Sequence, residues 1–83
     1  MHASPEQIQQ WAGSIMEEIA YDMSDGILPD DVASFSALHD HVDANDYASQ
    51  AVPQGDLSWD DYLELLNAVE TEVDRRLKAR AAM

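Results

Sequence analysis

The sequence predicts a small all-α protein, a three-helix bundle, and three observations support this. Apolar residues recur at steps of three and four in separate stretches, helix-capping residues precede these stretches, and 83 residues suffice for a single domain. We expect helices over residues 5–24, 35–44 and 59–80, within one domain that covers residues 1–83. A chain this short buries only a modest core, so a homodimer, which would add to the buried area, is compatible with the sequence.

The first helix has a clear beginning and end in the sequence. Ser4 can cap it, Pro5 suits the first helical position, and Gln7 stands where it can complete a capping box. Asp25 and Gly26 are expected to end it. Its apolar stripe consists of Ile8, Trp11, Ala12, Ile15 and Ile19.

The second helix is predicted to be short and to be followed by the longest loop of the chain. Ser34 is its expected cap, and Phe35, Leu38 and Val42 share one face. Over residues 45–57 the apolar periodicity vanishes, and residues 53–56 (Pro-Gln-Gly-Asp) are typical of a turn.

The third helix is the longest and the most clearly marked. Ser58 can cap it, with Asp61 in the reciprocal position, and Leu57 can pack against Tyr62 as a hydrophobic staple. Its apolar stripe consists of Tyr62, Leu63, Leu66, Val69, Val73 and Leu77. A helix of about 20 residues spans the domain, so we expect it to organise the other two.

Charge is distributed very unevenly along the chain. The sequence has 17 Asp and Glu against 4 Lys and Arg, a formal net charge of −13. All the acidic residues lie within residues 1–74, and all Lys and Arg lie within residues 75–80. Such a surface repels phosphate and anionic lipid, so we expect no direct nucleic-acid binding, no membrane binding, and a basic protein surface as the partner. The alternative interpretation is that acidity serves only solubility or life at high salt.

Metal binding and catalysis are not predicted. His39 and Asp43 stand one helical turn apart, but His39 and His41 would point about 160° apart on a helix. A calcium loop beginning at Asp43 would need Gly and an acid where Ala48 and Gln54 stand. The chain has no cysteine, no glycine-rich phosphate loop and no nucleophile elbow. We therefore expect a protein that is not an enzyme, has no catalytic residues and uses no cofactor.

An acidic stripe on the third helix is the best candidate for a binding site. Its residues follow one another at steps of three or four, which places neighbours about 5–6 Å apart. Charges at this spacing can imitate a nucleic-acid backbone and occupy a basic groove. Trp59 and Tyr47, which flank the predicted loop, are candidate aromatic anchors. The predicted partner-binding residues are Asp60, Glu64, Glu70, Asp74, Trp59 and Tyr47, with Asn67 within the stripe.

Residues 35–47, which read FSALHDHVDANDY, resemble a run in uncharacterised small acidic proteins of actinobacteria and their bacteriophages. The resemblance covers 13 of the 83 residues and carries no catalytic or binding residues. It implies a phage or mobile element as the source, and with it an inhibitor of a host nucleic-acid-binding protein.

The functional expectation is a small acidic protein-binding module, in its most specific form a nucleic-acid (DNA) mimic that inhibits a basic host protein. The alternative is a structural or assembly subunit that forms a homo-oligomer and is acidic only for solubility. No apolar run is long enough to cross a bilayer, and residues 1–5 lack the basic and apolar blocks of a signal peptide, so we expect a cytoplasmic protein.

Overall fold

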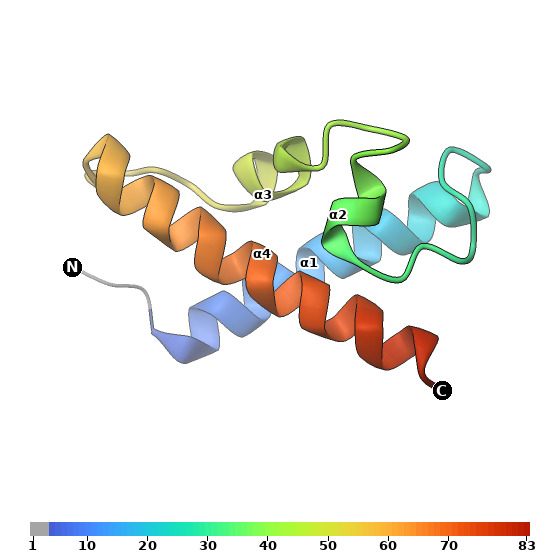
Figure 1. Cartoon of the computed structure of the whole chain (residues 1–83). Helices are drawn as coiled ribbons and strands as arrows, with labels where there is room; N and C mark the ends of the chain where they lie inside the picture. Colours follow the sequence, from blue (N-terminus) through green and yellow to red (C-terminus); the bar gives the residue numbers. More distant parts are fainter. Residues whose placement is uncertain (1–3) are drawn as a thin grey trace.

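A computed structural model describes residues 4–83, which form four α-helices and no strand (Figure 1). The helices are α1 (Pro5–Ser24), α2 (Phe35–Leu38), α3 (Asn45–Ala51) and α4 (Trp59–Ala81). This confirms the predicted all-α bundle. Residues 1–3, part of the start that we judged unlike a signal peptide, lie outside the described residues. Within residues 4–83, no helix combines the length and apolar character that a bilayer span requires.

Helix α1 begins and ends as its sequence predicts. The Ser4 hydroxyl accepts a hydrogen bond from the Gln7 backbone N–H, and the Gln7 side chain accepts one from the Ser4 N–H, both at 3.2 Å. At the other end, Gly26 has φ +80°, a conformation that residues with a side chain rarely adopt. The Ile27 N–H then donates to the Asp22 carbonyl at 2.9 Å, which closes the helix with a Schellman-type turn.

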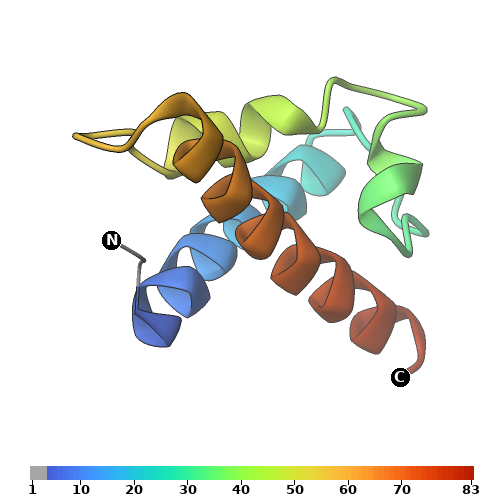
Figure 2. The ribbon, with the colours of Figure 1, turned by 60° about the vertical axis from the view of Figure 1, so that its left-hand side comes forward.

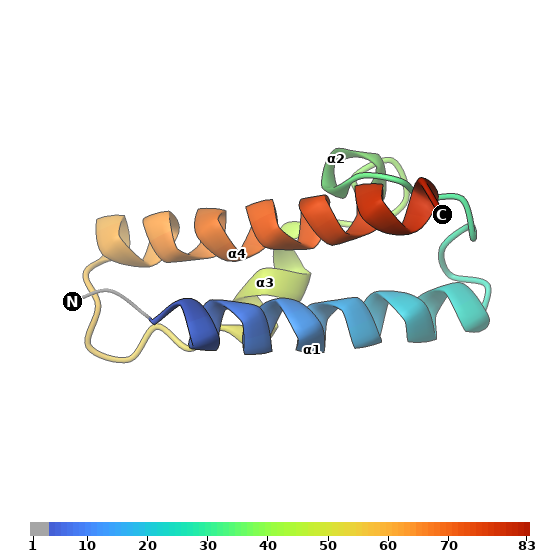
Figure 3. The ribbon, with the colours of Figure 1, turned by 90° about the horizontal axis from the view of Figure 1, so that it is seen from below.

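Helix α4 is the longest element and packs against each of the other three. The Ser58 hydroxyl caps it by accepting from the Asp61 N–H at 3.2 Å. α4 crosses α1, α3 lies across one side of this pair, and α2 lies against the second half of α4 (Figures 1 and 2). Seen from below, α1 and α4 begin at the same end of the molecule (Figure 3).

The second helix is shorter than predicted. A helix was expected over residues 35–44, but α2 ends at Leu38 and the chain turns through residues 39–44. Asp40, His41 and Asp43 are weak helix formers. The Asp43 carboxylate instead accepts a hydrogen bond from the Asn45 N–H at 3.2 Å, a local contact that competes with helical bonding.

The predicted long loop is also wrong in part, because α3 occupies Asn45–Ala51. The missed signal is a stripe of small residues: Ala44, Ala48 and Val52 recur every four residues and are all fully buried. Alanine buries little apolar area on its own, so this periodicity is weak in a hydropathy pattern. It allows α3 to lie close to α1 and α4.

The core lies where α1, α3 and α4 meet and extends beneath α2. α1 and α4 each supply four buried residues, spaced mainly at four. The buried apolar residues are Ala12, Ile15, Ile19, Met23, Leu28, Val32, Phe35, Leu38, Ala44, Ala48, Val52, Tyr62, Val69, Val73 and Leu77.

Candidate partner-binding surface on helix α4

The first half of α4 exposes two large apolar side chains beside two carboxylates. The side chain of Trp59 is 61% exposed and that of Leu63 is 44% exposed. They lie one helical turn apart and so share a face. Asp60 and Glu64, the next residue in each case, are also exposed. We call Trp59, Asp60, Leu63 and Glu64 the α4 surface.

The α4 surface is exposed because α2 covers only the later part of α4 (Figure 1). The contact that fixes α2 there is a hydrogen bond from the Phe35 N–H to the Asp74 carboxylate, at 2.8 Å. Trp59 lies beyond this cover. Its ring packs on Tyr62, with 6.0 Å between the ring centroids. The indole is therefore supported from below by a buried aromatic ring while most of its surface faces outward.

Asp74 belongs to the contact with α2 and not to the α4 surface. One of its carboxylate oxygens accepts from Phe35, and the other lies 2.7 Å from the Lys78 ammonium. The hydrogen bond from Lys78, followed by that from the Phe35 backbone, lowers the pKa of Asp74 below its usual value. Its charge is thus partly neutralised within the molecule.

Glu70 is half-buried, unlike Asp60 and Glu64. Burial raises the pKa of Glu70, while the nearby charge of His39 lowers it by a smaller amount. The structure therefore divides the predicted acidic stripe. Asp60 and Glu64, with Asn67, are exposed, whereas Glu70 and Asp74 face the α2 region.

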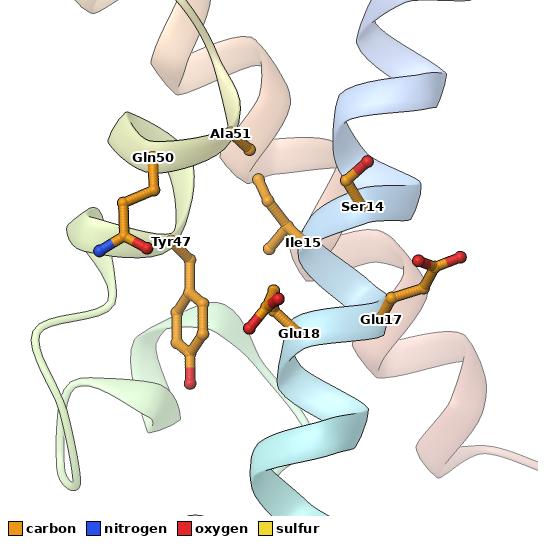
Figure 4. A pocket seen from close by; sticks show the side chains of 7 residues that line it. All are labelled: Ser14, Ile15, Glu17, Glu18, Tyr47, Gln50 and Ala51. Atoms are coloured by element: carbon orange, nitrogen blue, oxygen red, sulfur yellow. The ribbon is translucent and has the colours of Figure 1, made fainter.

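Tyr47 lies on α3, where it lines a groove between α1 and α3 (Figure 4). Its hydroxyl donates a hydrogen bond to the Asp22 carboxylate of α1. Burial, followed by this hydrogen bond and the charge of Asp22, raises the pKa of Tyr47. The groove has a volume of about 330 Å³, and Glu17 and Glu18 stand on its α1 wall. The structure thus separates Tyr47 from the α4 surface, with which the sequence grouped it.

Three of the four basic residues at the end of α4, Arg75, Arg76 and Lys78, form ion pairs with carboxylates, and Arg80 donates a hydrogen bond to the Asp30 carbonyl. Glu72 accepts hydrogen bonds from the Arg75 Nε at 2.9 and 3.0 Å, and the Arg76 Nε lies 3.4 Å from it. The hydrogen bond from Arg75 is the main cause that lowers the pKa of Glu72 to about 2. Within the described residues, Lys and Arg form ion pairs only with Glu72 and Asp74. The rest of the anionic surface is therefore not neutralised by the chain's own Lys and Arg.

The histidine-rich turn does not form the arrangement that we considered for a metal. The His39 Nδ1 accepts a hydrogen bond from the Ala44 N–H at 3.4 Å, and its ring packs edge-on against Phe35. α2 has ended before Asp43, so His39 and Asp43 do not share a helical face. Among residues 4–83, no three His, Cys, Asp or Glu side chains converge as metal ligands.

Comparisons with protein-family models, curated proteins and solved structures find no match to this chain. Of the large apolar residues that are exposed, Tyr21, Ile27, Trp59, Leu63 and Met83, the pair Trp59 and Leu63 lies one turn apart on a single helix face.

Proposed function

We propose that the protein is a small acidic protein-binding module that docks on a basic protein through the α4 surface. The observation that carries this proposal is the exposure of Trp59 and Leu63, at 61% and 44%, beside the carboxylates of Asp60 and Glu64. A large aromatic side chain at the centre of a contact and charges at its rim are typical of binding hot spots. Trp59 supplies affinity, and the carboxylates select a cationic partner.

The charge of the whole molecule supports a basic partner. The net charge is −13, and three of the four Lys and Arg residues that could oppose it form ion pairs near the end of α4. An uncompensated anionic surface accelerates encounter with a cationic protein and repels nucleic acids and acidic proteins. Binding of this kind weakens as salt screens the charges.

The test is an affinity purification from the source cells with matched baits. The wild-type protein and three variants are immobilised: Trp59→Ala, the double variant Asp60→Asn/Glu64→Gln, and the control Asp30→Asn/Asp31→Asn, which removes the same charge elsewhere. We expect a basic protein to be retained by the wild type and the control. Trp59→Ala should weaken binding by about 2 kcal/mol, or about thirtyfold.

The salt dependence completes this test. For the wild type, we expect affinity to fall steeply as NaCl rises, and the Asp60→Asn/Glu64→Gln variant should show a shallower fall. A partner that binds all four baits equally, or whose affinity does not change with the NaCl concentration, would contradict the proposal.

Nucleic-acid mimicry is the narrower form of this proposal. It requires that the basic partner use the same surface for DNA or RNA, and Asp60 and Glu64 would occupy phosphate positions there. Because Asp74 is paired with Lys78, the imitation would be limited to the first half of α4. Once a partner is purified, competition with duplex DNA tests this form: mutually exclusive binding supports it, and a ternary complex excludes it.

Self-association is the second candidate function, since Trp59 and Leu63 would also bury apolar area against another copy. The two functions predict opposite effects of the same variant. Asp60→Asn/Glu64→Gln removes repulsion between two identical acidic faces, so it should strengthen a homodimer but weaken binding to a basic partner. Sedimentation velocity over a concentration series measures the first effect, and the bait assay measures the second.

A further inference from the structure

A second concave site lies at the end of the molecule where α1 and α4 both begin. It is a groove of about 400 Å³, bounded by the start of α1, the loop of residues 53–57 and the start of α4. The same end is visible in Figure 3, where the loop joins α3 to α4 beside the start of α1. We call it the loop groove. It is separate from the groove between α1 and α3 that contains Tyr47, since the two share no lining residue.

The walls of the loop groove are largely apolar. Trp11, Leu57 and Leu65 each line it and are each only partly buried. Their inner faces pack against the core, so they are held in place while their outer faces remain accessible. An accessible apolar groove with rigid walls can accept a hydrophobic stem without first rearranging.

The rim of the loop groove is anionic. Asp56, in the loop, and Asp61, in the first turn of α4, are both exposed and both line it. None of its lining residues is basic. The chain's Lys and Arg lie in residues 75–80, at the opposite end of α4 (Figure 3). An apolar wall below two carboxylates complements a side chain with an aliphatic stem and a cationic end.

We propose that the loop groove receives an arginine side chain of the basic partner. This inference rests on the proposed function, because it assigns a second contact to the same partner. The methylene stem packs against Leu57 and Leu65, and the guanidinium lies between the indole of Trp11 and the carboxylates of Asp56 and Asp61. Arginine fits better than lysine, since its planar cation stacks on an aromatic ring and donates to two carboxylates at once.

The experiment uses Nα-acetyl-arginine amide as the probe and ¹⁵N-labelled full-length protein in NMR. The two indole N–H signals report the two sites separately, Trp11 the loop groove and Trp59 the α4 surface. We expect a saturable shift of the Trp11 signal and of the Leu57 and Leu65 amides. The neutral isostere Nα-acetyl-citrulline amide should give no such shift, and the lysine analogue should bind several times more weakly.

Charge-neutralising variants test the anionic rim. Asp56→Asn and Asp61→Asn should each weaken the arginine probe about fivefold, which corresponds to about 1 kcal/mol. Asp40→Asn, an exposed carboxylate elsewhere, is the matched control and should not change binding. Asp61 lies in the first turn of α4, so a thermal melt must show that its variant folds, and Asp56→Asn repeats the test outside any helix.

The outcomes separate this inference from the proposed function. Equal shifts with citrulline, no shift of the Trp11 signal, or unchanged affinity in both Asp variants would overturn the loop-groove site. If Trp59→Ala abolishes partner binding while the Trp11 signal does not shift with the probe, the proposed function is supported and the loop-groove site is rejected. If the Trp11 signal shifts but the wild-type bait captures no basic protein, the loop groove binds arginine, but its assignment to a basic partner is overturned together with the proposed function.

Discussion

Asp74 shows how one carboxylate can be structural in a protein whose acids look alike in the sequence. It accepts the Phe35 N–H at the start of α2 and pairs with Lys78. Asp74→Ala leaves that N–H without its acceptor and should lower the free energy of unfolding by about 1–2 kcal/mol. Asp74→Asn keeps an acceptor oxygen and should cost less than half as much. Urea unfolding measures both, and equal stability of the Ala variant and the wild type would contradict this role.

Asp74, together with Glu72, predicts that the free energy of unfolding decreases at acidic pH. The folded pKa values of Asp74 and Glu72 lie below their usual values of 3.8 and 4.5, so both groups stabilise the fold above those values. Their contribution is lost as the pH falls from about 4.5 towards 2, because protonation then breaks their ion pairs. The Glu72→Gln variant should therefore lose less stability than the wild type over this interval, as measured by urea unfolding at stepwise pH.

Glu70 predicts the opposite pH dependence. Its folded pKa is raised by burial, so it favours the fold below about 4.5 and disfavours it once the pH passes the folded pKa. The glutamine side chain of Glu70→Gln is uncharged at every pH. The free energy of unfolding of this variant should therefore exceed that of the wild type by about 0.5 kcal/mol at pH 7 and equal it at pH 4. Glu64→Gln, on the exposed part of the same helix, is the control for simple charge removal. A gain for Glu70→Gln no larger than the control's would argue against the burial effect.

At the scale of the elements, one buried hydroxyl fastens α3 to α4. The Tyr62 hydroxyl donates to the carbonyl of Val52, the residue directly after α3, at 2.6 Å. Tyr62→Phe leaves this buried carbonyl without its donor and should cost about 1–2 kcal/mol, with faster hydrogen exchange in α3. Tyr21→Phe is the matched control, since that ring is 65% exposed, and it should change neither quantity.

The long helices could be predicted from sequence because their signals are local. The caps of α1 and α4, Ser4 and Ser58, bond to the residues three positions on, as the spacing indicates. The start of α2 was predicted as well, since Ser34 caps it by accepting from the Ala37 N–H at 3.1 Å, but the end of α2 and the whole of α3 could not be predicted in this way. The early end of α2 reflects weak helix formers and a side-chain contact of Asp43, and α3 is stabilised by close packing of alanines that carry little hydropathy signal.

The candidate site was predictable only in part for a related reason. Sequence spacing placed Asp60, Glu64, Glu70 and Asp74 on one side of α4, but which of them face water depends on where α2 lies. That position is set by contacts 39 residues apart in the chain, such as the one between Phe35 and Asp74. The loop groove likewise lies between the start of α1 and residues 53–65, which are far apart in the chain, so no local pattern predicts it.

At the scale of the whole molecule, like charges oppose folding. With a net charge of −13, compaction brings carboxylates together, and added salt should screen their repulsion. We expect NaCl, raised from about 0.01 M to about 0.3 M, to add about 1 kcal/mol of stability, or several degrees in Tm. Circular dichroism melts measure this, and sucrose, which lacks charge, is the control for effects on hydration. A Tm that is independent of ionic strength would contradict it.

The confinement of all Lys and Arg to the last turns of α4 also determines how the protein can be detected. Trypsin cleaves after these residues, so within this sequence it can cut only between residues 75 and 81. Digestion thus leaves residues 1–75 as one long peptide, which is too large for routine peptide mass spectrometry. An enzyme that cleaves at Asp or Glu divides the same residues into shorter peptides, because all 17 acidic residues lie within residues 1–74.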